Sequence, residues 1–212
     1  MRYDHIIWDW NGTLFNDTDL CVGIMGAMLD KRDLGPFDIA RYHELFGFPV
    51  ADYYQRLGFD FDREPFEDLA IEFIDGYTQG WRDHSLRSDA LAVSDALHNQ
   101  GVTQSILSAT EQNFLNETAT HFDLTERMTT LVGIDDHLAV SKLGQGLAFL
   151  DELHVPVYRV LFIGDTVHDH EVATAMGVDI ALVEGGHAPR GKLESTGAPV
   201  YVTLTALLSA LG

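Results

Sequence analysis

Residues 5–14, with the sequence HIIWDWNGTL, constrain the fold of this chain more than any other stretch. Large apolar residues lead directly into Asp9, and the turn-forming residues 11–13 follow it. A short apolar run that ends at a turn signal is typical of a buried strand. In an open α/β sheet, ligands bind beyond the carboxyl ends of the strands. We therefore predict that Asp9 stands at a functional site.

The second part of the chain alternates between strand and helix patterns. Apolar segments predict strands at residues 102–107, 131–134, 158–163, 178–183 and 199–202, and helical patterns separate them at 88–99, 111–121, 141–154, 168–176 and 204–211. This alternation favours a mostly parallel sheet that is covered by helices on both faces. We predict an α/β, Rossmann-like core that is formed by residues 1–15 and 83–212.

Residues 16–82 have a different pattern, with helical spacing and no strand signal. Asn16 or Asp17 is placed to cap the first of four predicted helices, at about residues 17–29, 37–46, 50–57 and 62–77. Because this block interrupts the sheet directly after its first strand, we predict that it lies above the carboxyl edge. Residues 16–82 would then form an all-helical cap, a lid over Asp9.

Charge and composition exclude several classes of function. The chain of 212 residues carries 33 acidic and 13 basic side chains, which gives a net charge of −20. Such a charge repels nucleic acids and anionic membrane surfaces, so we predict neither as a partner. No apolar run approaches the roughly 18 residues of a membrane span. An anionic substrate needs local cations, and the chain has only three lysines: Lys31, Lys142 and Lys192.

The single cysteine, Cys21, excludes an intramolecular disulfide and fits a reducing cytoplasm. Residues 1–5 lead into the first strand without the charged and apolar segments of a signal peptide. We therefore predict a cytoplasmic protein in which Cys21 is a small buried residue on a helix. No feature of the sequence specifies an oligomeric state.

Other polar residues stand at ends of predicted elements, as Asp9 does. Ser108 follows a strand, Lys142 begins a helix, and Asp165 follows another strand with Asp169 four residues later. The order resembles that of the haloacid dehalogenase-like (HAD) hydrolase superfamily, whose motifs are Asp-x-Asp-x-Thr, a strand ending in Ser or Thr, a lysine, and Gly-Asp with a further Asp. The resemblance spans the whole chain, including a helical insertion where the family has its cap.

The fourth motif, GDTVHD at residues 164–169 followed by residues 171–173, is most similar to the phosphoglycolate phosphatase-like branch. The resemblance implies a Mg²⁺-dependent phosphatase that hydrolyses a small phosphorylated metabolite. In that reading Asp9 attacks phosphorus and forms an aspartyl-phosphate. Asp9, Asp165 and the backbone carbonyl of Asn11 would bind Mg²⁺, and Asp169 would orient the metal shell or a bound water.

The resemblance also implies a set of groups that neutralise the phosphoryl oxygens. Lys142 would act in catalysis and phosphate binding as a point charge. Thr13 and Ser108, with turn amides near Gly12 and Ala109, would donate hydrogen bonds to the transferring group.

Each residue also has a structural interpretation that the sequence leaves open. Ser108 can satisfy the backbone at a strand end, Lys142 can be a solvated helix residue, and Asp165 can cap the next helix. His168 is interpreted as a solvated neighbour. The loop at residues 185–187 suits either a substrate contact or a plain turn.

Asn11 departs from the family pattern, which has a second Asp at this position as general acid and then general base. An amide does not exchange a proton near neutral pH, and general acid–base catalysis is worth about 10²–10⁴-fold. We therefore expect slow cleavage of alkyl phosphates, or another acid. The cap residues Arg41, Arg56 and His43 are candidates for reading the leaving group.

Two other functions stay open. A phosphonoacetaldehyde hydrolase-like enzyme would need a cap lysine for a Schiff base, and Lys31 is the only one in residues 16–82. A phosphate-binding or regulatory domain would keep Mg²⁺ but turn over little because of Asn11. A haloacid dehalogenase needs no Mg²⁺, which the Gly-Asp-x-x-x-Asp motif disfavours. In a receiver domain the lysine follows the hydroxyl residue and lies on the last strand. Here a further strand, which ends in Gly164 and Asp165, follows Lys142, and this order disfavours a receiver domain.

Overall fold

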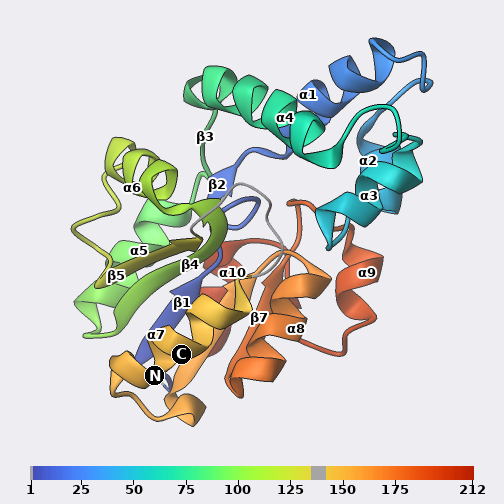
Figure 1. Cartoon of the computed structure of the whole chain (residues 1–212). Coiled ribbons are helices and arrows are strands. Elements are labelled where there is room, and N and C mark those ends of the chain that lie inside the picture. The colour runs from blue at the N-terminus through green and yellow to red at the C-terminus, as the bar shows by residue number, and fades with distance from the viewer. Residues whose placement is uncertain (1, 135–141) are drawn as a thin grey trace.

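The computed structural model of the chain describes residues 2–134 and 142–212 and has a parallel sheet at its centre (Figure 1). The six strands lie in the order β5-β4-β1-β6-β7-β8, and every neighbouring pair is parallel. They are β1 (His5–Trp8), β4 (Thr103–Glu111), β5 (Thr130–Ile134), β6 (Val160–Gly164), β7 (Asp179–Val183) and β8 (Val200–Tyr201). The predicted Rossmann-like α/β core is confirmed.

Strand β1 lies in the middle of the sheet because its side chains are apolar on both faces. Ile6, Ile7 and Trp8 are fully buried. Ile6 and Trp8 belong to one hydrophobic cluster and Ile7 to another, on the opposite face. Near-continuous apolar character is what a parallel strand covered on both sides requires. The last residue of β1, Trp8, pairs with Ile106 and Ile163, so the next residue, Asp9, emerges at the carboxyl edge.

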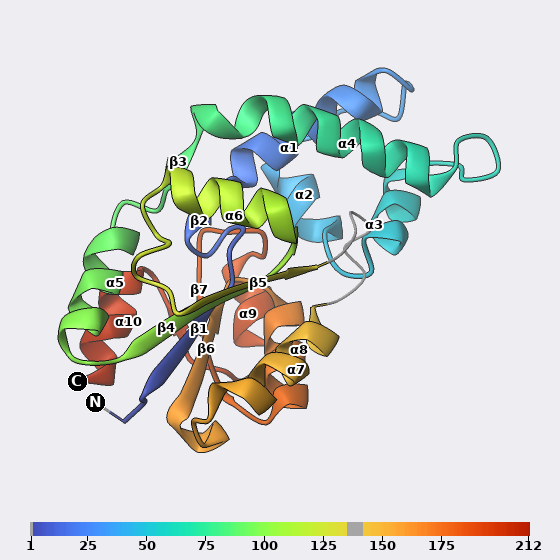
Figure 2. The same cartoon turned by 60° about the vertical axis from the view of Figure 1, so that its left-hand side comes forward.

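Helices of the core cover both faces of the sheet, as Figure 2 shows. They are α5 (Ala90–Asn99), α6 (Gln112–His121), α7 (Leu143–Leu153), α8 (Val167–Met176), α9 (Arg190–Glu194) and α10 (Leu204–Leu211). Helices α5 and α10 lie together on one side, and α7 and α8 on the other. The predicted helix start at residue 141 lies outside the described residues. No helix in the described ranges combines the length and apolar character of a membrane span.

Four helices of the N-terminal part form a separate layer over the carboxyl edge of the sheet (Figure 1). They are α1 (Thr18–Asp30), α2 (Ile39–Leu45), α3 (Val50–Leu57) and α4 (Phe66–Gly80), and a 3₁₀ turn, η1 (Trp81–Asp83), follows. A second 3₁₀ turn, η2 (Val157–Arg159), precedes β6. The layer is the predicted helical cap, while its predicted bounds, residues 16 and 82, stay a prediction.

Three features of the fold differ from the sequence prediction. Strands β2 (Phe15–Asn16) and β3 (Ser85–Leu86) pair antiparallel where the chain enters and leaves the cap. Two-residue strands have no detectable periodicity, so the sequence did not indicate them. Strand β4 runs to Glu111 instead of ending at residue 107, with an irregular register against β5 after Leu107. Helix α9 was also not predicted.

Candidate active site

Asp9 and Lys142 form a buried ion pair at the carboxyl edge of the sheet. Asp9 directly follows β1 and Lys142 occupies the N-cap position of α7, and both are less than a tenth exposed. The Nζ of Lys142 donates to Oδ1 of Asp9 and lies 2.7 Å from Oδ1 of Asp169. An ammonium group held between two buried carboxylates is fixed in position, which excludes a solvated Lys142.

Three carboxylates converge around this lysine. Asp9, Asp165 and Asp169 are buried, and one oxygen from each lies within 4.8 Å of the others. Burial, and then the neighbouring charges of Asp169 and Asp165, raise the pKa of Asp9 well above its usual range despite Lys142. Burial also raises the pKa of Asp165, and Asp169 adds to the effect. A hard divalent cation would relieve this repulsion, so these oxygens fit Mg²⁺.

Asp169 belongs to a capping box at the start of α8. The N-cap residue is Thr166, whose hydroxyl accepts from the backbone N–H of Asp169, and the Asp169 carboxylate accepts from the backbone N–H of Thr166 at 2.9 Å. Asp165, which the sequence left open as a cap, therefore does not cap this helix. Burial opposes ionisation of Asp169, but the charge of Lys142 and these hydrogen bonds outweigh it and lower the pKa of Asp169.

Asp165 is held by the first motif and by the loop after β7. Its Oδ1 accepts from the hydroxyl of Thr13 at 2.9 Å, and its Oδ2 accepts from the backbone N–H of His187 at 2.6 Å. Thr13 is fully buried and does not line the cavity of the site. Its contact therefore supports Asp165, and the phosphate-binding role expected for Thr13 stays a prediction.

Two glycines let the backbone approach Asp165 closely. A Cβ at Gly186 would lie 2.1 Å from Oδ2 of Asp165 and 2.8 Å from the carbonyl oxygen of Gly12. A Cβ at Gly12 would lie 2.4 Å from the same carboxylate oxygen, and the φ of Gly12 is +72°. No larger residue fits either place without displacing Asp165.

Ser108, Thr110 and Asn11 form a chain of hydrogen bonds beside Asp9. The hydroxyl of Ser108 accepts from the backbone N–H of Thr110 at 3.0 Å and donates to the Thr110 hydroxyl, which in turn donates to Oδ1 of Asn11 at 2.7 Å. Ser108 and Ala109 line the cavity of the site. The Ser108 hydroxyl thus satisfies local backbone at the edge of the cavity, and the phosphate-binding roles expected for Ser108 and Ala109 stay predictions.

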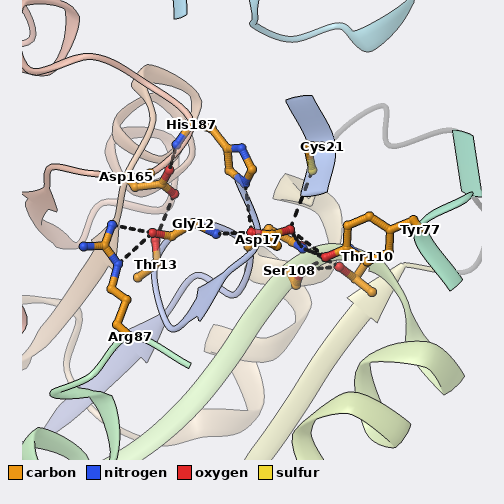
Figure 3. A network of polar contacts seen from close by, with 12 residues as sticks. Gly12, Thr13, Asp17, Cys21, Tyr77, Arg87, Ser108, Thr110, Asp165 and His187 are labelled. Atoms are coloured by element: carbon orange, nitrogen blue, oxygen red, sulfur yellow. Dashed lines mark hydrogen bonds and ion pairs between the residues drawn. The ribbon is translucent and has the colours of Figure 1, made fainter. Parts of the chain in front are cut away.

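Asp17 is the centre of a buried network that the sequence did not indicate (Figure 3). Its carboxylate accepts from Nδ2 of Asn11 at 2.7 Å, from the backbone N–H of Gly12 at 2.8 Å and from the hydroxyl of Tyr77 at 2.6 Å. Nδ2 of Asn11 also donates to the Tyr77 hydroxyl at 2.8 Å. Asp17 occupies the N-cap position of α1, but its side chain makes no capping bond there and binds the catalytic loop instead.

His187 joins this network from the core. Its Nε2 lies 3.3 Å from Oδ1 of Asp17, and its Nδ1 shares a hydrogen bond of 2.7 Å with the hydroxyl of Tyr42 on α2. Burial by itself would lower the pKa of His187, but Asp17 and Asp165 raise it to about 9. Asp17 is buried too, yet His187 and its hydrogen-bond donors lower its pKa. The result is a buried ion pair that connects cap and core.

Arg87 holds the two glycine-containing loops together. Its Nε and Nη2 donate to the carbonyl oxygen of Gly12 at 2.9 and 2.6 Å (Figure 3). Its Nη1 donates to the carbonyl oxygen of Glu184 at 2.8 Å. The guanidinium fork therefore fixes the spacing between the first motif and the loop after β7.

A cavity of about 450 Å³ lies between the carboxyl edge of the sheet and the cap. From the core it is lined by Asp9, Asn11, Ser108, Lys142, Asp169 and His187. From the cap it is lined mainly by aromatic side chains of α2, α3 and α4 and of the loop before α3. The helices of the N-terminal part therefore lie over Asp9, in the position that the sequence predicted for a lid.

The residues predicted to read a leaving group lie elsewhere. Arg41 donates to the carbonyl oxygen of Pro36 at 2.7 Å, and His43 shares a hydrogen bond of 3.0 Å with the carbonyl oxygen of Gly186. Arg56 lines a second, smaller cavity. None of the three lines the cavity that contains Asp9. His168 does line it, with its ring stacked on Phe48.

Sequence reasoning missed Asp17, Tyr77, Arg87 and Thr110 and left His187 undecided. These residues come from segments that are far apart in the chain, so no local spacing connects them. The one available signal was Asp17 itself, an acidic residue six positions after Asn11. As a helix cap it had a sufficient local explanation.

Comparisons with known proteins agree with this fold. The model of the family described as haloacid dehalogenase-like hydrolase matches residues 6–183. A relative, the N-acetylmuramic acid 6-phosphate phosphatase of Pseudomonas aeruginosa, is 27% identical over 207 residues, 95% of this chain and 91% of the relative. A structure described as a predicted phosphatase from Clostridium acetobutylicum superposes with a TM-score of 0.83 at 17% identity, covering 99% and 98% of the two chains. A predicted phosphoglycolate phosphatase from Haemophilus somnus gives a TM-score of 0.79 at 14% identity, covering 100% and 99%.

Proposed function

The chain belongs to the haloacid dehalogenase-like hydrolase family, as an enzyme of its phosphatase branch, and we propose that it is a Mg²⁺-dependent phosphatase of small metabolites that uses Asp9 as nucleophile. One observation carries the proposal. Asp9 is buried in contact with Lys142 at the carboxyl end of β1, with the Asp165 and Asp169 carboxylates beside it. Phosphoryl transfer depends on positioning and charge neutralisation, and this arrangement supplies both.

In the first step, a carboxylate oxygen of Asp9 attacks phosphorus, the P–O ester bond breaks, the alkoxide leaves and takes a proton from water, and an aspartyl-phosphate forms. In the second step, water attacks the phosphorus of this intermediate, which releases phosphate and restores the Asp9 carboxylate. Lys142 holds Asp9 in place and offers its charge to the phosphoryl oxygens. Ser108 and Ala109 line the cavity, and the Ser108 hydroxyl would donate to the same oxygens after turning its hydrogen away from Thr110, together with the backbone amide of Ala109. The cap aromatics exclude bulk water from the cavity, which strengthens these interactions.

The metal would be held by Asp9 and Asp165, with the backbone carbonyl of Asn11 as a further ligand and Asp169 in support. When bound, Mg²⁺ supplies positive charge against the phosphoryl group as it approaches Asp9. The residues present fit this role because their buried carboxylates outnumber the single ammonium group of Lys142. Thr13, His187 and the two glycines hold Asp165 in the required place.

Among the described residues, the site has no evident general acid to protonate the leaving group. Both functional groups of the Asn11 amide are engaged, with Asp17, Tyr77 and Thr110. Asp17 stays ionised because its pKa is lowered, so it is no general acid either. We therefore propose that turnover of alkyl phosphates is slow compared with that of esters with good leaving groups.

The alternative reaction, phosphonoacetaldehyde hydrolase-like cleavage of a carbon–phosphorus bond, requires a lysine in the cavity. Lys31, the only lysine of the predicted cap, is exposed and pairs with Glu72 at 3.0 Å. It does not line the cavity that contains Asp9. A Schiff base on Lys31 would therefore form away from the nucleophile, which disfavours carbon–phosphorus chemistry.

The test is phosphate release from p-nitrophenyl phosphate with Mg²⁺ and with a chelator, for the wild type, Asp9→Asn and Lys31→Arg. We expect loss of activity with the chelator and in Asp9→Asn, and wild-type activity in Lys31→Arg. Mass spectrometry of acid-quenched enzyme should find a phosphorylated protein in the wild type only. Mg²⁺ binding without turnover in the wild type would contradict the proposal and favour a phosphate-binding domain.

A further inference from the structure

The cap side of the cavity is built from aromatic side chains. Those in contact with the space above the catalytic carboxylates include Phe46, Phe48, Tyr53, Tyr54, Phe66 and Phe73. Met25, Val50 and Ile74 fill the positions between them. Once the phosphoryl group lies against Asp9, the rest of the substrate must lie against this aromatic wall.

No lysine or arginine of the cap lines the aromatic wall among the described residues. Lys142 is the one lysine or arginine that lines the cavity there, and it is already paired with Asp9 and Asp169. The chain outside the described ranges, residues 135–141, carries no lysine or arginine in its sequence. A carboxylate on the leaving group would therefore be desolvated against aromatic rings, because the two charged bases that line the cavity, Lys142 and His187, are already paired with carboxylates.

Two arginines of the cap, Arg32 and Arg56, are engaged in other contacts. Arg32 pairs with Glu64 at 2.8 Å and with Glu72 at 2.6 Å, and its side chain is mostly buried by them. Arg56 donates to the carbonyl oxygen of Leu45 at 3.2 Å. Releasing either side chain toward the cavity would break hydrogen bonds that already satisfy it.

Acidic residues at the core side of the cavity add to the discrimination. Glu111 and Glu117 both line it. Glu111 accepts from the backbone N–H groups of Asn113 and Phe114 at 2.9 Å, so its charge is held at the start of α6. Glu117 is paired with Arg82, so a second negative charge on the substrate would face mainly the Glu111 carboxylate, which disfavours its binding.

One polar group of the wall has no partner in the described structure. Tyr53 is 2% exposed, lines the cavity, and its hydroxyl makes no hydrogen bond. Burial raises the pKa of Tyr53, so this hydroxyl stays neutral. A hydrogen-bonding group on a ligand would satisfy this unpaired buried hydroxyl.

We propose that the substrate is the phosphate monoester of an uncharged, largely apolar alcohol, with an aromatic group that packs against the cap. The proposal rests on the proposed function and specifies its substrate class. It separates this site from one that takes a carboxylated leaving group such as glycolate.

The experiment compares three phosphate esters of primary alcohols: ethyl phosphate, 2-phenylethyl phosphate and 2-carboxyethyl phosphate. All three release a similar alkoxide, so differences in kcat/KM report the contact with the cavity. We expect 2-phenylethyl phosphate to exceed ethyl phosphate by about 10- to 100-fold, the gain for burying an aromatic side chain. We expect 2-carboxyethyl phosphate to be the poorest of the three. Equal or better use of 2-carboxyethyl phosphate would overturn the proposal.

The matching phosphonates keep the substrate class testable without turnover. Calorimetry with Mg²⁺ should rank 3-phenylpropylphosphonate above propylphosphonate and 3-carboxypropylphosphonate last. If the phosphonates bind in this order but none of the esters is hydrolysed, the proposed function is wrong and the substrate class is supported. Hydrolysis of all three esters with a reversed ranking would do the opposite.

A matched pair of variants on α4 places a cation inside or outside the cavity. Ile74 lines the cavity, whereas Ile71, one turn away, is 58% exposed and does not line it. We expect Ile74→Arg to raise the ratio of 2-carboxyethyl to 2-phenylethyl kcat/KM by roughly tenfold or more, because the new cation meets the carboxylate. Ile71→Arg should leave the ratio unchanged. Equal ratios in both variants, with thermal melting showing both folded, would count against the proposal.

Discussion

The carboxylate of Asp17 accepts a hydrogen bond of 2.7 Å from the side-chain amide of Asn11. Asn11 takes the position of the family's second aspartate, and Asp17 is fully buried beside it. An aspartate at residue 11 would place two carboxylates in one buried site, where like charges raise one pKa strongly. The amide of Asn11 is therefore required by its neighbour, and the departure from the family pattern has a local physical cause.

This contact predicts that Asn11→Asp destabilises the protein. We expect its free energy of unfolding at pH 7 to fall by about 3 kcal/mol, because a hydrogen bond becomes a buried repulsion. The double variant Asn11→Asp/Asp17→Asn should recover most of this loss, since an amide again faces a carboxylate. Urea denaturation of the wild type, both single variants and the double variant measures the coupling. Asn116→Asp, at an exposed site on α6, is the control.

The same double variant makes a kinetic prediction. With the carboxyl group at residue 11, a proton donor stands beside Asp9, so cleavage of ethyl phosphate should rise by up to about 10²-fold over the wild type. The gain should be smaller for p-nitrophenyl phosphate, whose leaving group needs less protonation. If Asn11→Asp alone were as stable and as fast as the double variant, Asp17 would not be the reason for Asn11.

Gly186→Ala tests the packing of the loop after β7 against Asp165. The new Cβ would lie 2.1 Å from the carboxylate, so Asp165 must move. We expect the Mg²⁺ concentration for half-maximal activity to rise by about 10- to 100-fold, as for other losses of support around a metal ligand. Gly191→Ala in α9, where a Cβ meets nothing within 4 Å, should leave it unchanged. A normal Mg²⁺ requirement in Gly186→Ala would contradict the role of Asp165.

Arg87→Lys tests the fork between Gly12 and Glu184. A lysine cannot reproduce its three hydrogen bonds to carbonyl oxygens, so we expect a loss of roughly 2 kcal/mol in the free energy of unfolding. Activity should fall as well, because the two loops that hold Asp165 are no longer tied. Arg82→Lys, exposed and paired with Glu117, is the control for the substitution and should change neither quantity.

His5 predicts how stability depends on pH. Burial lowers the pKa of His5 to about 4 from an ordinary value of 6.5, so between these values the unfolded chain binds more protons than the folded one. The contribution of His5 is therefore fully present above pH 6.5 and is lost as the pH falls toward 4, by about 3 kcal/mol in total. Unfolding in urea at pH 7 and pH 5 should show a smaller pH difference in His5→Gln than in the wild type. His98→Gln, at an exposed site, should keep the wild-type difference.

Much of the core could be predicted because its signals are local. The apolar run of β1 stops at Asp9, and a strand buried on both faces needs such a run. The sequence also placed Lys142 and Asp169 at the starts of helices, where the structure has them, while their roles stay predictions. The short strands β2 and β3 were missed, since a pair of two-residue strands is stabilised by its partner and by the cap and not by its own pattern.

The sequence by itself determined the order of the longer strands and helices, and which carboxylates stand at strand and helix ends, because these follow from local periodicity and turn chemistry. Only the tertiary structure decided what each carboxylate does. Asp17 and His187 are 170 residues apart, and no local pattern indicates that they pair at 3.3 Å. The apolar cavity also depends on tertiary structure, because helices α3 and α4 bring their aromatic side chains together only when they pack over the sheet. Burial without water makes these distant contacts strong, and burial is a property of the folded chain alone.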